Sequence, residues 1–187
     1  TVDLTPEGNT QVFTPTTGTT TKPKAVVSTD EMESTLRAVN IIPAAGEFIY
    51  GTTEYQREDG LGGYITENKH TSSGDTDFVH SLDNLEEVAS NVDSASLVVS
   101  WFGDSLDATV CTVKPKVDNS NKVVTPSDWV VSGETRSTAG VVSQYDGKAA
   151  FGGTPSDKTI REAVTEMKSR GLRVMFYPFL MMDMTNY

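Results

Sequence analysis

The sequence predicts an α/β fold made of successive βα units, in a parallel sheet or barrel. Residues 96–104 (Ser-Leu-Val-Val-Ser-Trp-Phe-Gly-Asp) are a predicted buried strand with a carboxylate just past its C-terminal end, and residues 172–183 repeat this arrangement. A helix is predicted before each strand. Because such folds build their sites at the C-terminal ends of strands, the pattern locates a candidate site, although it does not name a reaction.

The second unit shows most directly why these elements are expected. Thr154 is a suitable N-cap and Gly171 provides a stop, so a helix is predicted over 155–170. Residues 172–180 are almost continuously apolar, as a strand covered on both faces requires. Pro178 has no N–H to donate, so strand pairing is expected to weaken there. The apolar stripe of the predicted helix consists of Ile160, Ala163, Val164 and Met167.

The first unit follows the same logic. A helix is predicted over 78–92 and a strand over 96–102, and an earlier strand over 36–42 ends at Pro43. We expect the three predicted strands to lie parallel in neighbouring positions, with both helices on the outer face. Val99, in the middle of the second strand, is expected to be buried.

Composition excludes several classes of partner and cofactor. The chain has 187 residues, of which 36% are hydrophobic, which is enough for one core. Its net charge of −11 argues against nucleic acid, because phosphate contacts need clustered Lys and Arg. No apolar run is long enough to span a membrane. With only His70, His80 and the single Cys111, a transition-metal site is not expected, and no cofactor is predicted.

The two ends of the chain differ in character. The first 35 residues are rich in Thr, Pro and Gly, and are predicted to be a linker or extended segment. Residues 36–187 form the predicted globular domain. Three parallel strands do not close a barrel, and a full (β/α)8 barrel needs roughly 250 residues. We therefore expect this chain to be a segment of a longer polypeptide that holds the first three βα units.

An insertion over residues 105–153 is too long for an ordinary βα loop. Residues 108–113 alternate as a strand would, and 129–131 and 141–142 are further short β candidates, with a turn predicted over 145–148. We expect a small antiparallel β insertion over the C-terminal face of the sheet. It would serve either as a lid on a site or as a docking surface.

Four motifs carry a family resemblance: Ala44-Ala-Gly-Glu-Phe48, residues 96–104, Phe151-Gly-Gly-Thr-Pro-Ser-Asp157 and Phe176-Tyr-Pro-Phe-Leu-Met-Met-Asp183. In order and spacing they closely resemble the TIM-barrel-like domain of phage tail and gene-transfer-agent host-specificity proteins, the very large baseplate proteins sometimes called megatron. The resemblance runs from about Val39 to the C-terminus. The family is described as glycoside-hydrolase-like, so the resemblance implies a partial (β/α)8 TIM-barrel-like domain.

The resemblance also implies a setting and partners. It indicates a virion component at the tail tip or baseplate that meets the bacterial envelope, where peptidoglycan or another envelope glycan is a candidate ligand. The implied protein partners are other tail and baseplate proteins, the hub, and copies of the chain itself in a multimer.

Three carboxylates just beyond predicted strand ends are the candidate catalytic residues: Glu47, Asp104 and Asp183. Glycoside hydrolysis needs two carboxyl groups that flank one bond, about 5–5.5 Å apart for retention and about 6.5–9.5 Å apart for inversion. Trp101 and Tyr177 are candidates to stack on a sugar ring. The alternatives are structural: a carboxylate after a strand is often a helix cap or part of a salt bridge, and an aromatic residue in a core strand often only packs.

Two functions from different classes follow from these observations. The first is a structural component of a phage or phage-like tail tip, in which the barrel is a scaffold. The second is a glycoside hydrolase that acts on peptidoglycan or a host surface glycan. Because the later strands that usually supply the acid and nucleophile of such barrels lie beyond this sequence, no catalytic pair is assigned and enzyme activity stays uncertain. The structural role is favoured.

Overall fold

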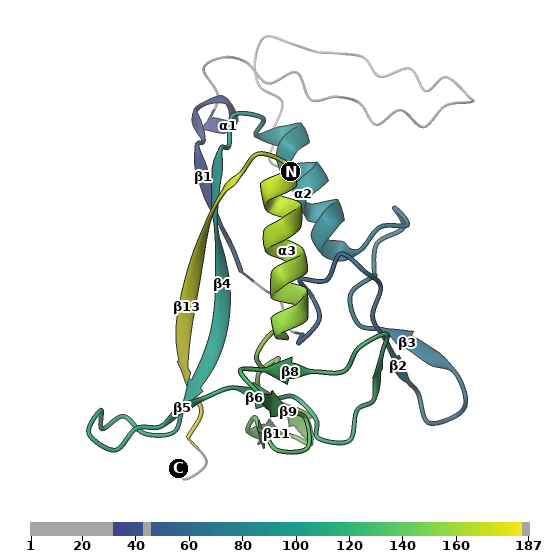
Figure 1. The fold of residues 1–187 in the computed structure, drawn as a ribbon, viewed down its shortest axis with the longest axis vertical. Coiled ribbons are helices and arrows are strands. Elements are labelled where there is room, and N and C mark those ends of the chain that lie inside the picture. The colour runs from purple at the N-terminus through teal and green to yellow at the C-terminus, as the bar shows by residue number, and fades with distance from the viewer. Residues whose placement is uncertain (1–31, 43–45, 185–187) are drawn as a thin grey trace, which may run out of the picture.

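A computed structural model describes residues 32–42 and 46–184 of the chain (Figure 1). The predicted linker lies outside the described residues, except for its last few positions, where Met32–Thr35 form the short helix α1. Pro43, the predicted end of the first strand, and the first two residues of the Ala44–Phe48 motif also lie outside them.

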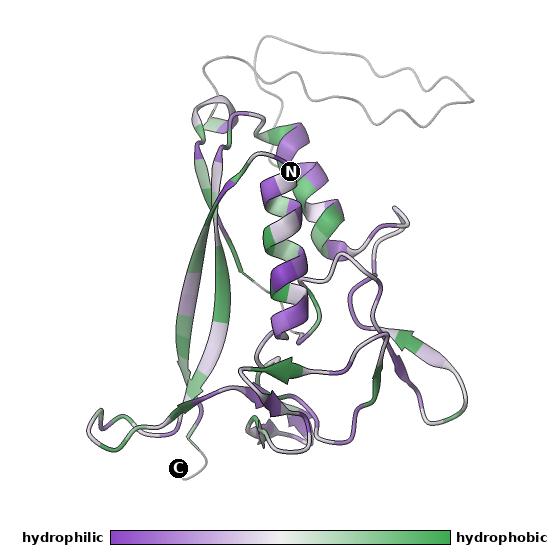
Figure 2. Ribbon diagram, viewed as in Figure 1, coloured by the Kyte–Doolittle hydropathy of each residue, from purple (hydrophilic) through white to green (hydrophobic). Residues whose placement is uncertain are grey.

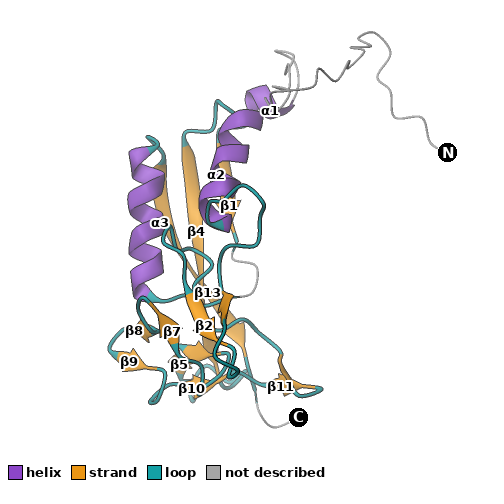
Figure 3. Cartoon of the chain, turned by 90° about the vertical axis from the view of Figure 1, so that its right-hand side faces the viewer, coloured by secondary structure: helices purple, strands orange, loops and turns teal. Residues whose placement is uncertain are grey.

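Three parallel strands form the main sheet. They are β1 (Ala38–Ile41), β4 (Ser94–Gly103) and β13 (Arg173–Met182), in the order β1-β4-β13. Both pairings are parallel, which confirms the predicted direction and neighbourhood of the three strands. Helices α2 (Asp77–Val88) and α3 (Asp157–Ser169) lie against one face of this sheet, as the view from the helix side in Figure 3 shows.

The main core lies between the sheet and the two helices. Side chains from α2, α3, β1, β4 and β13 form one cluster, in which Leu97, Ala163 and Met167 are fully buried. Val99 is 1% exposed, so its predicted burial is confirmed. Apolar residues are frequent along β4 and β13 (Figure 2), and in this core Ala95 and Leu97 of β4 pack with buried side chains of both helices.

Helix α3 begins two residues later than predicted. Its N-cap is Ser156, whose side chain accepts a hydrogen bond from the Thr159 N–H, and not Thr154. The C-terminal stop at Gly171 is confirmed. Gly171 has a φ of +81° and donates to the Lys168 carbonyl, while Leu172 donates to the Met167 carbonyl, which is the Schellman arrangement.

Pro178 does not weaken strand pairing, contrary to prediction. The register of β13 with β4 is continuous from Arg173 to Met182. The N–H groups of Arg173 and Asp183 both donate toward β4, so odd-numbered residues of β13 point their backbone groups at β4 and even-numbered residues point outward. Pro178 therefore faces the edge of β13 with which no described strand pairs, and its missing N–H leaves no gap in the ladder.

The remaining strands are two or three residues long. β2 (Gln56–Glu58) forms a hairpin with β3 (Tyr64–Thr66), and β7 (Val124–Thr125) pairs with the other side of β2. The insertion contributes β5 (Val113–Lys114), β6 (Lys116–Val117), β7 (Val124–Thr125), β8 (Val130–Val131), β9 (Glu134–Thr135), β10 (Gly140–Val141), β11 (Gln144–Tyr145) and β12 (Lys148–Ala149).

The insertion is antiparallel only in part. β8 pairs with β9 and β11 with β12 in antiparallel hairpins, but β6 and β10 pair in parallel. The predicted turn between β11 and β12 is present: Asp146 and Gly147 both have positive φ, as a two-residue hairpin loop requires. A second core of Phe48, Tyr55, Val117, Val124, Trp129 and Val131 lies beneath the insertion.

The predicted fold class, an α/β fold holding the first three βα units of a (β/α)8 barrel, is wrong. Across the described residues, the helices have only 4, 12 and 13 residues, and most strands are short and belong to small separate sheets. The reason lies in residues 46–76 and 105–154, where Gly, Asn, Asp, Ser and Thr favour turns and short hairpins over helices. The parallel strands are correctly predicted, but these two segments dominate the architecture.

Candidate functional site

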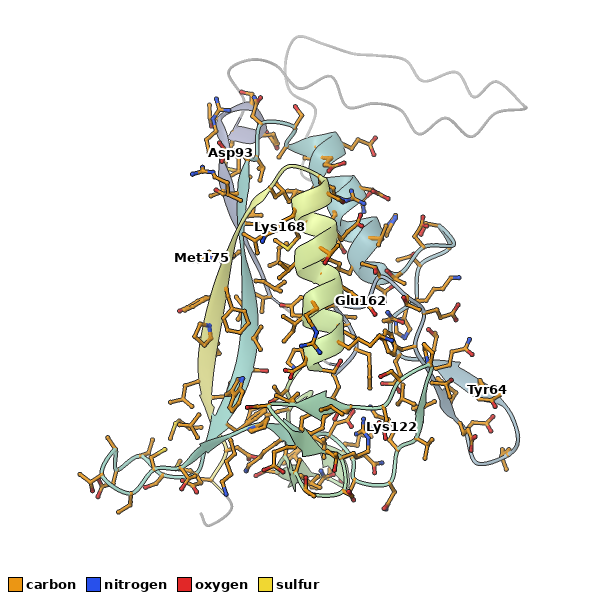
Figure 4. All side chains as sticks on the ribbon, viewed as in Figure 1. Tyr64, Asp93, Lys122, Glu162, Lys168 and Met175 are labelled. Atoms are coloured by element: carbon orange, nitrogen blue, oxygen red, sulfur yellow. The ribbon has the colours of Figure 1, made fainter. Side chains whose placement is uncertain are left out.

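Glu47 lies in a fully buried cluster of charges. Its side chain is 0% exposed, Arg136 binds both of its carboxylate oxygens, with its Nη2 at 2.6 Å from Oε2, and Lys122 lies 3.2 Å from Oε2. The Asp118 N–H donates to Oε1 at 2.8 Å. Lys122 is labelled in Figure 4 among the side chains of the insertion.

Burial and charge act in opposite directions in this cluster. Burial raises the pKa of the Glu47 carboxyl, and the hydrogen bond from Arg136 and the charge of Lys122 oppose that rise. Burial alone would lower the pKa of Arg136 and of Lys122, but Glu47 and the other neighbouring carboxylates together outweigh it, so both pKa values are raised. The two basic groups therefore stay charged beside the buried carboxyl, as in a structural ion pair.

Asp183 is the second buried carboxylate, with 2% of its surface exposed. Lys116 Nζ lies 2.8 Å from Oδ2, and the Ser143 N–H donates to both oxygens at 3.1 and 3.2 Å. The Ser143 hydroxyl donates to Oδ1 as well. Burial alone would raise the pKa of Asp183, but the hydrogen bonds from Lys116 and Ser143 outweigh it and hold that pKa below its usual value.

One short segment of the insertion holds both carboxylates. Lys116 pairs with Asp183, and two residues later the Asp118 N–H donates to Glu47. Asp104 is placed differently. It is exposed, and its Oδ1 accepts a hydrogen bond of 2.7 Å from the Thr112 N–H, which organises the loop after β4. The structure thus brings Glu47 and Asp183 beneath one segment and leaves Asp104 on the surface.

The two candidate sugar-stacking residues lie on opposite faces of the sheet. Successive side chains of a strand alternate between faces, and Trp101 stands in register with Leu180 whereas Tyr177 stands in register with Val98. Trp101 packs against the second core. Tyr177 is 43% exposed and makes an edge-on contact with Phe179, with ring centroids 6.3 Å apart. Trp101 and Tyr177 therefore cannot line one sugar site together.

The carboxylates have little capacity left for catalysis. Every oxygen of Glu47 and Asp183 already accepts a hydrogen bond from a buried or half-buried donor. A general acid or a nucleophile must contact the bond that it cleaves. The carboxylates of Glu47 and Asp183 present no free oxygen to a substrate. Their arrangement fixes the insertion against the C-terminal ends of the strands.

Among the described residues, His70 is paired with Asp77 and is not part of a cluster of metal-binding groups. His70 Nδ1 lies 2.6 Å from Asp77 Oδ2, and the histidine side chain is largely exposed. Within residues 32–42 and 46–184, no three His, Cys, Asp or Glu side chains are close enough together to hold a metal ion. In that same part of the chain, no helix is both long and apolar enough to cross a membrane.

The sequence did not reveal the basic residues that pair with Glu47 and Asp183. Arg136 and Glu47 are 89 residues apart, and Lys116 and Asp183 are 67 apart. Spacing along the chain carries no signal over such separations. Only the composition gave a signal. The chain has 15 basic residues, and Lys116, Lys122 and Arg136 lie in the insertion among short apolar β segments, where they could pair with buried carboxylates.

Neither a protein-family model nor a curated protein matches this sequence. The family resemblance therefore stays a prediction that rests on the four motifs.

The ion pair of Asp183 predicts acid sensitivity. Because its pKa is lowered on folding, its stabilising contribution is present above the unfolded-state pKa of about 3.9 and is lost as the pH falls through the folded value. Asp183→Asn should lower the free energy of unfolding at neutral pH by about 1.5–3 kcal/mol. Urea unfolding at a series of pH values should show that the free energies of unfolding of the wild type and of Asp183→Asn converge below about pH 4. A difference in the free energy of unfolding that stays constant with pH would contradict the ion pair assigned to Asp183.

Proposed function

We propose that the chain is a non-catalytic assembly module in the tail tip or baseplate of a phage or phage-like particle, where it contacts the host envelope. The setting is supported by the resemblance of four motifs to those of host-specificity proteins. The assembly role is supported by one structural observation, the apolar strand β13. Three large side chains on its face opposite the helices are between 43% and 59% exposed: Met175, Tyr177 and Phe179.

An exposed apolar strand of this length indicates a contact surface. Monomeric proteins seldom leave several neighbouring large apolar side chains uncovered. Within the described residues, β13 pairs only with β4, so one of its edges is free as well. The partners that this surface would meet are other tail and baseplate proteins, the hub, or further copies of the chain.

The carboxylates support a scaffold over a hydrolase. Glu47 and Asp183 are neutralised by Arg136, Lys122 and Lys116 in buried contacts, which join the insertion to the parallel sheet. Such contacts hold a docking platform in shape. Host glycan binding, if it occurs, would use exposed side chains and not this buried pair.

The proposal is tested by variants in the complete particle. Asp104 is exposed, and the amide oxygen of Asp104→Asn can still accept the hydrogen bond from the Thr112 N–H, so infection or gene transfer should be unchanged, and any peptidoglycan cleavage by particles should be unchanged too. Tyr177→Asp and Phe179→Asp place charge on the apolar strand and should impair assembly. Loss of glycan cleavage in Asp104→Asn particles, with assembly intact, would favour the hydrolase and contradict the proposal.

A further inference from the structure

The face of the main sheet opposite the helices carries two unlike rows of side chains. Val174 packs into the core beneath the helices, so the odd-numbered residues of β13 point to the opposite, open face. Figure 4 shows Met175 on the side of the sheet away from α3. The large row of the open face consists of Met175, Tyr177, Phe179 and Met181 on β13.

The neighbouring row, on β4, consists of smaller side chains as far as Ser100 and ends at Phe102. Ser96, Val98 and Ser100 stand in register with Met175, Tyr177 and Phe179 respectively. The open face is therefore a ridge along β13 beside a groove along β4.

A hollow lies at each end of the groove. A hollow of about 500 Å³ lies over Asn40, Ser94 and Ser96, and another of about 320 Å³ lies over Val98, Ser100 and Phe102. The ring of Phe151 closes the second hollow at the end where the insertion begins, 5.7 Å from the ring of Phe102. The second hollow has a mainly apolar lining, which suits large apolar or aromatic side chains.

We propose that a second copy of the chain covers this face in a two-fold symmetric dimer, in which the β13 ridge of each copy lies in the β4 groove of the other. A two-fold axis requires one surface to be complementary to itself, and a ridge beside a matching groove meets that requirement. Sheets commonly pack face to face in this way, with interdigitated side chains. The inference rests on the proposed assembly role and names the partner of its apolar strand.

Charge is compatible with a second copy at this face. Across β1, β4 and β13 the only charged residue is Arg173, so packing two such faces buries no carboxylate. Each copy nevertheless carries a net charge of −11, and the two copies repel each other over longer distances. Salt screens that repulsion, so association should strengthen as ionic strength rises.

The area of the open face determines how strongly two copies should associate. β4 and β13 have ten residues each and are about 33 Å long, but β1 has four and is about 13 Å long, so at about 4.8 Å per strand the face is roughly 380 Å² per copy. Two copies would bury about 760 Å², which is below the size of stable specific interfaces. The dimer should therefore be weak and concentration-dependent.

Strand addition at the free edge is the less suitable mode of association. Pro178 points its backbone to that edge and has no N–H to offer a further strand. Proline at an edge is a common device against such pairing. A substitution at Phe176 distinguishes face-to-face packing from strand addition, because Phe176 is 51% exposed on the same strand but points to the helix side of the sheet.

Sedimentation velocity of the purified chain over a wide range of concentration tests the proposal. The chain should form a reversible dimer that tightens with salt, and Tyr177→Asp should weaken it about tenfold or more. The matched control Phe176→Asp should dimerise like the wild type. Circular dichroism checks folding, and Phe179→Ser, which adds no charge, gives a second reading if Tyr177→Asp unfolds.

Two outcomes would overturn the dimer. A wild type that stays monomeric at every concentration and salt would mean that another polypeptide covers the face. An equal loss in Phe176→Asp and Tyr177→Asp would mean pairing at the edge. Neither result bears on whether the chain is present in particles, so failure of the dimer is distinguishable from failure of the proposed function.

Discussion

Arg136→Met is expected to lower the free energy of unfolding by about 3–5 kcal/mol. The substitution keeps most of the side-chain volume but leaves the fully buried carboxylate of Glu47 with Lys122, at 3.2 Å, as its remaining cation. A buried carboxylate that loses its bidentate partner keeps its desolvation penalty and loses the compensating hydrogen bonds. Urea unfolding at neutral pH measures the effect.

Arg173→Met is the matched control, because Arg173 also forms a 2.8 Å ion pair, with Asp93, but both side chains are largely exposed. Its effect should stay below about 1 kcal/mol. The double variant Glu47→Met/Arg136→Met should recover part of the loss, since no unpaired charge is left from that pair. Equal effects of Arg136→Met and Arg173→Met would contradict the structural role assigned to the buried pair.

Val99→Asp is expected to destabilise the protein by several kcal/mol. Val99 is 1% exposed near the centre of β4, beside Pro178 of β13, and the one cation of the three strands, Arg173, stands in register with Ser94, five residues away along β4. The introduced carboxylate would have to stay buried and unpaired, or take up a proton, and each course lowers stability. Thermal unfolding followed by circular dichroism should show a large fall in the midpoint.

Val110→Asp provides the comparison for Val99→Asp. Val110 is 67% exposed in the loop after β4, so a carboxylate there stays hydrated and should change stability by less than about 0.5 kcal/mol. A small effect of Val99→Asp would mean that β4 is not the central buried strand of the sheet.

The parallel strands and their helices could be predicted because their signals are local. The apolar run before Asp104 and the stop at Gly171 each act within a few residues, and the structure confirms both. Pro178 shows where local rules stop. Whether a proline breaks a ladder depends on which way its backbone points, and that is decided by register with β4, a contact of long sequence separation.

The fold class and the site partners depended on such distant contacts. The two turn-rich segments could have been long loops over a barrel, but they fold into short hairpins around Trp129 and Val131 instead. Glu47 and Asp183 were identified as polar groups after strands, yet their chemistry is set by Arg136, Lys122 and Lys116 from the insertion. Without those contacts, a catalytic carboxylate and the acid of an ion pair look alike in sequence.

The composition of purified particles tests the central claim most directly. Particles separated on a density gradient from cells that produce the protein would be digested, and the chain quantified by mass spectrometry against a tail component of known copy number. An assembly module should be present at a fixed low ratio that survives high-salt washing, while little of it is free in the lysate. A chain that is absent from washed particles and soluble in the lysate would contradict the account.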